Sequence, residues 1–338
     1  MGNKFIQFTL FISALLLLFS CSNTAKKTIS GKPNINVRPF NPMINGKWVG
    51  AGISYGPFRD GEGPDKGSIV SKEHLLEDMK ILSKKWNLLR VYGTGKNAEN
   101  ILEVIKENNI PMLVMQGAWI NGKAPKEVND QQILEVIELA NEYPDIICAV
   151  NIGNEILVDW SWHRVSNQQI IIDYIRQTRA AIKQPVTVND DFNYWNKSVS
   201  KEIADEVDFI GLHGYAFWNN QGYSNAITWT KEMYQSIQEL HPNHQVAFCE
   251  TGWPTSRIWD SNSFEGKLVG IANEDNQKDF YAWFRQWVIK EKINSFYFEA
   301  FDENWKGGWD GENAAEKAEK HWGLYEEDRS PKPALLNP

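Results

Sequence analysis

Short apolar runs alternate with longer amphipathic runs along this chain from Lys47 onward. Apolar runs of about four to eight residues, bounded by Gly, Pro, Asn or Asp, are typical of buried strands. By this criterion the sequence predicts strands at Val49–Ser54, Leu88–Tyr92, Pro111–Gln116, Ile147–Gly153, Val186–Asn189, Asp208–His213, Gln245–Cys249 and Ser295–Phe301.

The intervals between these strands have helical periodicity. Ile101, Val104 and Ile105, for example, are spaced as one face of a helix. The predicted helices are Lys72–Lys85, Ala98–Asn108, Asp130–Glu142, Asn167–Lys183, Ser224–Leu240 and Asn276–Lys290, with a shorter one near Val199–Glu206.

This regular alternation of strand and helix predicts an α/β fold, a single-domain (β/α)8 TIM barrel over residues 47–338. The alternative is a doubly wound open sheet. That fold would need a nucleotide-type glycine loop after the first strand, and Gly56-Pro57-Phe58-Arg59 is not one. We therefore expect the functional site at the C-terminal ends of the barrel strands.

The N-terminus has the pattern of a targeting segment. Lys4 precedes an apolar stretch that ends in Leu18-Phe19-Ser20-Cys21, which resembles the bacterial lipoprotein cleavage box. The sequence predicts a lipoprotein signal peptide over 1–20 and a polar tether over 21–46 that begins at a lipidated Cys21. We expect export and anchoring to a bacterial membrane, the outer membrane, on its periplasmic or surface side. A plain signal peptide or anchor is the alternative.

Composition narrows the classes of function. The net charge is −8 and Lys and Arg form no cluster, which argues against nucleic-acid binding. The six histidines form no metal-binding motif, so no metal is expected. Cys148 and Cys249 fall on strands that are not neighbours in a barrel, which predicts two buried free thiols.

Tryptophan is abundant, with fifteen residues, and many lie beside loop-forming residues. Flat indole faces with polar neighbours suit sugar rings, although packing in the core is an equally good interpretation. The tryptophans in this setting are Trp160, Trp162, Trp195, Trp218, Trp253, Trp259, Trp305 and Trp309.

Polar and aromatic residues end the predicted strands, whereas the strands themselves are apolar. The residues at these ends are Tyr55, Arg90, Tyr92, Gln116, Asn154, Glu155, Asp190, His213, Tyr215, Glu250, Trp253 and Glu299. Glu155 and Glu250 directly follow the fourth and seventh strands, which places them across the barrel mouth from each other. Glycoside hydrolysis requires such a pair of carboxyl groups. For either residue alone, an ion pair with Arg or Lys is the alternative.

Three blocks of residues resemble glycoside hydrolase family 17. They are Asn151-Ile152-Gly153-Asn154-Glu155, Glu250-Thr251-Gly252-Trp253-Pro254 and the segment from Phe298 to Lys306. The stretches 52–58 and 321–324 fit as well, so that the resemblance spans residues 47–333.

The resemblance implies a retaining enzyme without a cofactor that cleaves β-1,3-glucans of the laminarin type. It implies that Glu155 is the acid/base and Glu250 the nucleophile, with the two carboxyl groups about 5 Å apart. The predicted substrate contacts are Tyr55, Asn154, His213, Tyr215, Trp253, Glu299, Glu303, Trp305 and Lys306. Among them, Tyr215 or Tyr55 would contact the nucleophile, and a structural ion pair is the alternative for Glu299.

Three other functions remain open at this point. A transglycosylase would use the same two glutamates and pass the sugar to another sugar. A non-catalytic, surface glycan-binding lipoprotein is disfavoured because both glutamates are present, and a related barrel enzyme would act on mannan or cellulose. The long stretches Thr251–Gln277 and Trp305–Trp322 would wall the cleft, either as loop filler or with extra substrate contacts or a block at one end. We expect a monomer.

Overall fold

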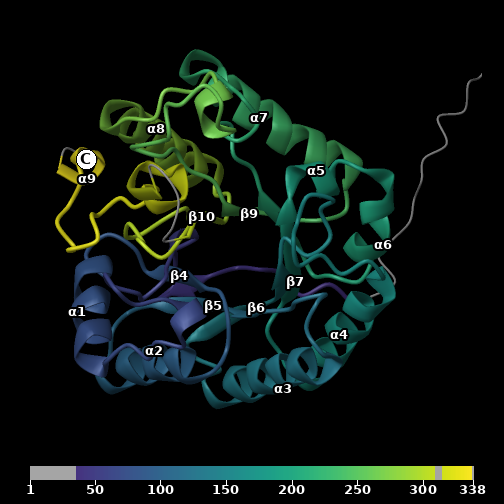
Figure 1. The fold of residues 1–338 in the computed structure, drawn as a ribbon. Coiled ribbons are helices and arrows are strands. Elements are labelled where there is room, and N and C mark those ends of the chain that lie inside the picture. Colours follow the sequence, from purple (N-terminus) through teal and green to yellow (C-terminus); the bar gives the residue numbers. More distant parts are fainter. Residues whose placement is uncertain (1–35, 309–313, 337–338) are drawn as a thin grey trace, which may run out of the picture. The chain divides into compact units, whose positions relative to one another are not determined.

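A parallel sheet closes on itself into a barrel, with the strand order β10-β3-β4-β5-β6-β7-β8-β9 (Figure 1). The computed structural model describes residues 36–308 and 314–336. The barrel strands are β3 (Ala51–Ser54), β4 (Leu88–Val91), β5 (Leu113–Ala118), β6 (Ile147–Asn154), β7 (Val186–Asp191), β8 (Ile210–His213), β9 (Val246–Glu250) and β10 (Ser295–Tyr297). Each predicted strand coincides with one of these, so the (β/α)8 prediction is confirmed.

Helices surround the barrel (Figure 1). They are α1 (Lys72–Leu82), α2 (Lys96–Glu107), α3 (Lys126–Glu142), α4 (Gln168–Ala181), α5 (Phe192–Trp195), α6 (Lys201–Ala204), α7 (Tyr223–Leu240), α8 (Glu274–Glu291) and α9 (Pro333–Leu336). Short 3-10 turns occur at η1 (Pro64–Lys66), η2 (Ser198–Ser200), η3 (Glu265–Lys267), η4 (Ala314–Glu316) and η5 (Ala318–Lys320). The six long helices were predicted, and α6 matches the shorter prediction. The one-turn α5 was not predicted, because four residues are too few to show a helical period.

A segment before the first barrel strand fills the N-terminal end of the barrel. It contains the unpredicted hairpin β1 (Met43–Ile44) and β2 (Lys47–Trp48). Phe40 is buried, and its ring stacks on Phe209 at 4.6 Å. Asn294 donates a hydrogen bond of 2.6 Å to the Phe40 carbonyl oxygen. The last part of the tether predicted over 21–46 is therefore packed against the barrel. The sequence did not indicate this, because the segment is mostly polar and Phe40 is a single aromatic residue within it.

Buried ion pairs fasten the C-terminal segment to the barrel. Arg329 donates to both carboxylate oxygens of Asp78 on α1, at 2.9 and 3.0 Å. Lys332 donates to Asp302, in the loop after β10, at 2.8 Å. Because these charges are buried, each depends on its partner, and the segment after β10 is firmly tied to the first helix.

The predicted signal peptide over 1–20, the lipidation site at Cys21 and most of the tether lie outside the described residues. Across the part of the chain that is described, no helix combines the length and apolarity needed to cross a membrane. Cys148 and Cys249 are both free thiols, as predicted, although Cys148 is only partly buried.

Candidate active site

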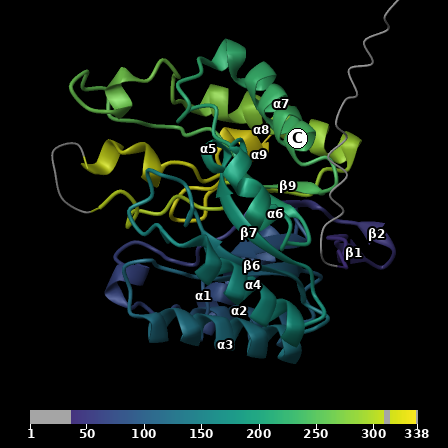
Figure 2. The same cartoon turned by 90° about the vertical axis from the view of Figure 1, so that its right-hand side faces the viewer.

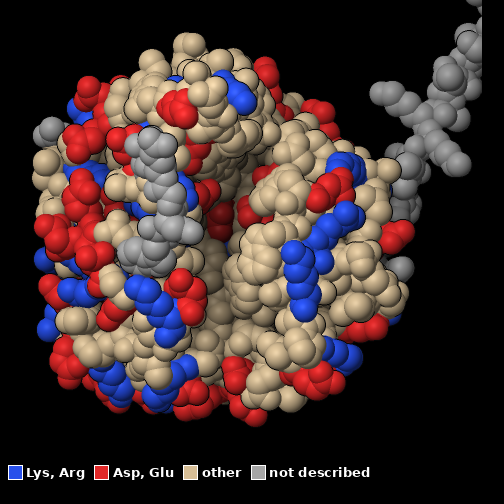
Figure 3. Space-filling view, viewed as in Figure 1, with Lys and Arg blue, Asp and Glu red and all other residues tan. Residues whose placement is uncertain are grey.

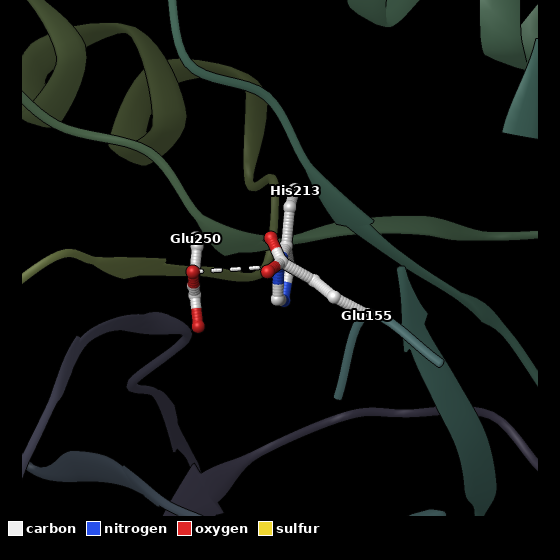
Figure 4. Close-up of side chains that lie close together, drawn as sticks. All are labelled: Glu155, His213 and Glu250. Carbon is white, nitrogen blue, oxygen red and sulfur yellow. Dashed lines mark hydrogen bonds and ion pairs between the residues drawn. The ribbon is translucent and has the colours of Figure 1, made fainter. Parts of the chain in front are cut away.

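Two carboxyl groups from opposite sides of the barrel meet at its C-terminal mouth. Glu155 follows β6 and Glu250 ends β9. One oxygen of each carboxyl group and a ring nitrogen of His213 all lie within 4.8 Å of one another. Figure 4 shows the two carboxyl groups facing each other beside the His213 ring. The structure thus brings together the pair predicted from the strand ends, at the separation that the resemblance implied.

An unusual backbone turn positions Glu155. Gly153 and Glu155 both have left-handed conformations, with φ of 78° and 51°. A Cβ atom on Gly153 would lie 2.3 Å from the Ile156 side chain, so only glycine fits there. The Glu155 amide donates to the Asn189 carbonyl of β7 at 2.9 Å, which holds the turn in place. Non-glycine residues rarely adopt this conformation, and it occurs preferentially at functional sites.

Three donors bind the carboxylate of Glu250. Arg90 and Tyr92 donate to Oε1 at 2.5 and 2.9 Å, and Tyr215 donates to Oε2 at 2.7 Å. Burial alone would raise the pKa of Glu250, but His213, Arg90 and Tyr215 together lower it to about 2. Burial also lowers the pKa of His213 to about 4, so His213 is neutral near neutral pH. There, Arg90 and the tyrosine hydroxyl keep Glu250 ionised.

Glu155 has the opposite electrostatic environment. Burial raises its pKa well above the usual carboxyl value, and the negative charge of Glu250 raises it further. His213 Nδ1 lies 3.0 Å from Glu155 and 3.3 Å from Glu250. The site therefore holds one carboxyl group that keeps its proton and one that does not, which is the arrangement used for acid and nucleophile roles.

Arg90 also joins two strand ends of the site. Its second terminal nitrogen donates to Asn154 Oδ1 at 2.5 Å, so one buried guanidinium joins Asn154 to Glu250. Sequence reasoning placed Arg90 and Tyr92 at strand ends but gave them no role. The available signal was a charged residue within an apolar strand, since a buried charge requires a partner.

An ion-pair cluster follows β10. Lys306 Nζ lies 2.5 Å from Glu299 and 2.8 Å from Glu303, and Trp305 donates to Glu303 at 3.0 Å. Burial raises the pKa of Glu299. The structural ion pair considered for Glu299 is thus present, and Glu303 and Lys306 belong to the same cluster. Glu299 Oε1 is buried and has no hydrogen-bond partner in the described chain.

Two of the predicted substrate contacts are buried and have their polar atoms bonded elsewhere in the chain. Tyr55 is buried and its hydroxyl donates to Asp78 at 2.9 Å, so Tyr215 alone of the two tyrosines contacts Glu250. Trp253 is fully buried and its indole donates to the Ile271 carbonyl. Both follow strand ends directly, but their side chains point into the packing between barrel and helices, a direction that sequence position does not reveal.

The other tryptophans divide between core and surface. Trp195 is buried, Trp218 and Trp305 are half-buried, and Trp160, Trp162 and Trp259 are exposed. Trp309 lies outside the described residues. The sugar-stacking interpretation therefore fits only part of this set.

Glu155, His213 and Glu250 are also spaced closely enough to bind a cation. The Arg90 guanidinium already neutralises Glu250 at 2.5 Å, which opposes a second positive charge there. Figure 3 shows acidic groups inside a groove that crosses this face of the molecule. A long, open groove with two carboxyl groups suits an extended polymer better than a metal ion.

Comparison with known proteins agrees with this geometry. The family model of the BtgE/BtgC glycoside hydrolase domain matches residues 52–323. A putative glucan endo-1,3-beta-glucosidase of Aspergillus niger is 27% identical over an alignment of 289 residues, and the match covers 79% of this chain and 40% of the relative. The glucan 1,3-beta-glucosidase of Schizosaccharomyces pombe is 25% identical, over 71% of this chain and 75% of that protein.

A solved structure has a similar fold. The endo-laminarinase of Formosa Hel1_33_131 superposes with a TM-score of 0.73 at 26% identity, over 85% of this chain and 86% of that one. This chain spans about two fifths of the length of the Aspergillus relative, so the match concerns one part of that larger protein.

Proposed function

This chain belongs to the BtgE/BtgC glycoside hydrolase family, and on that premise we propose that it is a retaining hydrolase of laminarin-like β-1,3-glucans. The observation that carries the proposal is the pair of carboxyl groups, with one oxygen of each within 4.8 Å of the other. Their opposite pKa shifts, raised for Glu155 and lowered for Glu250, support it. Retaining glycosidases place their two carboxyl groups about 5 Å apart, whereas inverting enzymes need roughly 6.5 Å or more to fit a water molecule. The resemblance to glycoside hydrolase family 17 and the names of the relatives favour β-1,3-glucan as the substrate.

In the first step, Glu250 attacks the anomeric carbon while Glu155 gives its proton to the glycosidic oxygen. The bond to the leaving sugar breaks, and a covalent ester joins the remaining sugar to Glu250. The raised pKa of Glu155 keeps the required proton available. Arg90, Tyr92 and Tyr215 keep the nucleophile ionised and oriented.

In the second step, Glu155 acts as a base. It has lost its proton, and it now takes one from a water molecule that attacks the anomeric carbon. The ester to Glu250 breaks, and the sugar leaves with the anomeric configuration of the substrate. Once Glu250 is esterified, its negative charge no longer raises the pKa of Glu155, so the same residue suits both steps.

The test is a reducing-sugar assay on laminarin, a β-1,4-glucan and a β-mannan, with NMR of the first product formed. We expect cleavage of laminarin with β-configured product. Glu250→Gln should abolish turnover, because the amide cannot form the ester. Activity confined to the β-1,4 polymers, or an α-configured product, would contradict the proposal.

Two further measurements separate the remaining alternatives. Glu155→Ala with an activated aryl β-glucoside should accumulate the glycosyl-enzyme, seen as an increase in intact mass, because the second step lacks its base. Products longer than the starting oligosaccharide at high substrate concentration would instead indicate glycosyl transfer as the main reaction.

We also propose that the protein is exported and lipidated at Cys21. The support is the sequence alone: Lys4, the apolar stretch that follows it, and the cleavage-box pattern that ends at Cys21. Labelling of cells with a palmitate analogue should mark the wild-type protein and leave Cys21→Ser unlabelled. An unlabelled wild-type protein in the soluble fraction would refute this proposal without affecting the catalytic one.

A further inference from the structure

Four aromatic side chains of the described chain are exposed: Trp160, Trp162, Trp259 and Phe264. They lie on two loops, 155–167 after β6 and 251–273 after β9, which follow the strands that carry Glu155 and Glu250. The other exposed large apolar side chains are aliphatic. Exposed aromatic area is unfavourable in water, so its restriction to these two loops indicates a ligand.

On the β9 side, a continuous line of rings leads to the nucleophile. Phe264 stacks on Trp218, with ring centres 6.1 Å apart and planes within 28°. Trp218 lies 5.7 Å from Trp322, which lies 4.9 Å from Tyr215. The hydroxyl of Tyr215 bonds Glu250. The exposed ring of Phe264 is thus the outer end of a row of packed rings, buried at Trp322 and Tyr215, that reaches the carboxylate of Glu250.

The loop that carries Phe264 is held by its own contacts. The buried guanidinium of Arg257 donates to the Glu265 and Leu268 carbonyls at 2.7 and 2.6 Å, and it stacks 3.9 Å from the Trp259 ring. Glu265 accepts from the Ile258 amide at 2.8 Å. In Figure 2 the green segment between β9 and α8 projects beyond the barrel. The loop therefore presents its aromatic rings in a preformed arrangement.

On the β6 side, a second stack leads to the acid/base residue. Trp162 lies 4.7 Å from the ring of His163, which stacks on Trp119 at 4.9 Å. His163 Nε2 lies 2.7 Å from the carbonyl oxygen of Asn154, the residue before Glu155. An exposed indole is thus anchored next to the turn that positions the proton donor.

We propose that Phe264 with Trp218, and Trp162 supported by the buried ring of His163, form two outer sugar-binding platforms on opposite sides of the cleavage point. The proposal rests on the function proposed above. The apolar face of a glucose ring suits an exposed aromatic ring, and nearby polar groups can bind its hydroxyls. Strands β7 and β8 separate β6 from β9 in the barrel, so a chain that touches both platforms extends to both sides of the carboxyl pair. The enzyme would then grip an internal stretch of glucan.

The test measures kcat/KM on linear β-1,3-gluco-oligosaccharides of increasing length. Trp162→Ala and Phe264→Ala should each lower kcat/KM on the longest substrates by about three- to tenfold, the range of an aromatic contact. On the shortest substrate that is cleaved, which does not reach the platforms, both variants should stay within about twofold of wild type. Trp162→Phe and Phe264→Tyr keep a ring and should retain most of the length dependence.

Matched controls come from exposed aliphatic residues on the helices. Leu134→Ala on α3 and Ile289→Ala on α8 remove similar exposed side chains and should leave every substrate unchanged. A platform is refuted if its alanine variant keeps the wild-type length dependence, or loses the same factor on all lengths. If the wild type cleaves no β-1,3-glucan, the proposed function fails by itself. In that case the migration of wild type and the same alanine variants is compared in gels containing laminarin. The variants should be retarded less than wild type, and equal retardation would overturn the platforms.

Discussion

The substitution Glu250→Gln should lower the pKa of Glu155. Their carboxyl oxygens approach within 4.8 Å, and two unit charges at that distance repel by about 3.5 kcal/mol at an effective dielectric constant of about 20. The effective repulsion between the two carboxylates is smaller than this value, because the Arg90 cation already offsets part of the charge on Glu250. Glutamine removes the negative charge at position 250. The positive charge of Arg90 is then no longer balanced by a carboxylate, and both changes favour ionisation of Glu155.

The assay is a carboxyl carbon NMR titration of protein with labelled glutamate. The signal of Glu155 is assigned by its loss in Glu155→Gln. Glu319→Gln serves as the graded control, because the charge of Glu319 also raises the pKa of Glu155 but ranks below those of Glu250 and Asp191. The expected order of the pKa of Glu155 is wild type, then Glu319→Gln, then Glu250→Gln lowest. An unchanged or higher pKa in Glu250→Gln would refute the claim that the two carboxyl groups are electrostatically coupled.

Three further predictions concern activity and stability. Because Glu155 must keep its proton, kcat/KM should be constant below the raised pKa of Glu155 and should fall as the pH rises through that pKa. Glu155→Gln should remove this basic limb from the pH profile. Tyr215→Phe should lower kcat by about 10- to 100-fold with an unchanged melting temperature, since a hydrogen bond to a charged group contributes about 1.5–3 kcal/mol; a wild-type kcat would exclude a role for this hydroxyl. Phe40→Ala should lower the free energy of unfolding by about 3–5 kcal/mol in denaturant titrations while KM stays constant; a loss below about 1 kcal/mol would show that the ring does not seal the barrel.

The sequence was sufficient for the barrel and for the two glutamates. Strands buried on both faces read as apolar runs, and the barrel architecture places their C-terminal ends in one site. That reasoning needs no knowledge of side-chain partners. It located Glu155 and Glu250, and the family resemblance offered Tyr215 as a partner of Glu250, but Arg90 and Tyr92 were not assigned to that carboxylate. Arg90 lies beside Glu250 only because β4 and β9 face each other across the barrel interior.

Three side chains have partners in the fold that the sequence pattern does not indicate. Tyr55 and Trp253 lie at strand ends, as substrate contacts do, yet the hydroxyl of one and the indole of the other are satisfied by Asp78 and Ile271. A polar atom at a strand end has several possible hydrogen-bond partners, and the packing of the folded chain determines which of them it bonds. The same holds for Phe40, whose burial depends on residues far along the chain, such as Phe209. Local pattern contains no information on these long-range pairings.

The bridge formed by Arg90 has a consequence for how such an enzyme can evolve. Because one buried guanidinium donates to both Asn154 and Glu250, a substitution of Arg90 would disturb both residues at once. Substitutions at these strand ends are therefore unsuited to changing specificity, because they also affect the nucleophile. The outer parts of the loops 155–167 and 251–273, which carry Trp162 and Phe264, contact the site through stacked rings, so substitutions there leave the Arg90 bridge untouched. Directed evolution toward other polysaccharides should accumulate its changes in the outer parts of those loops and leave the bridge intact.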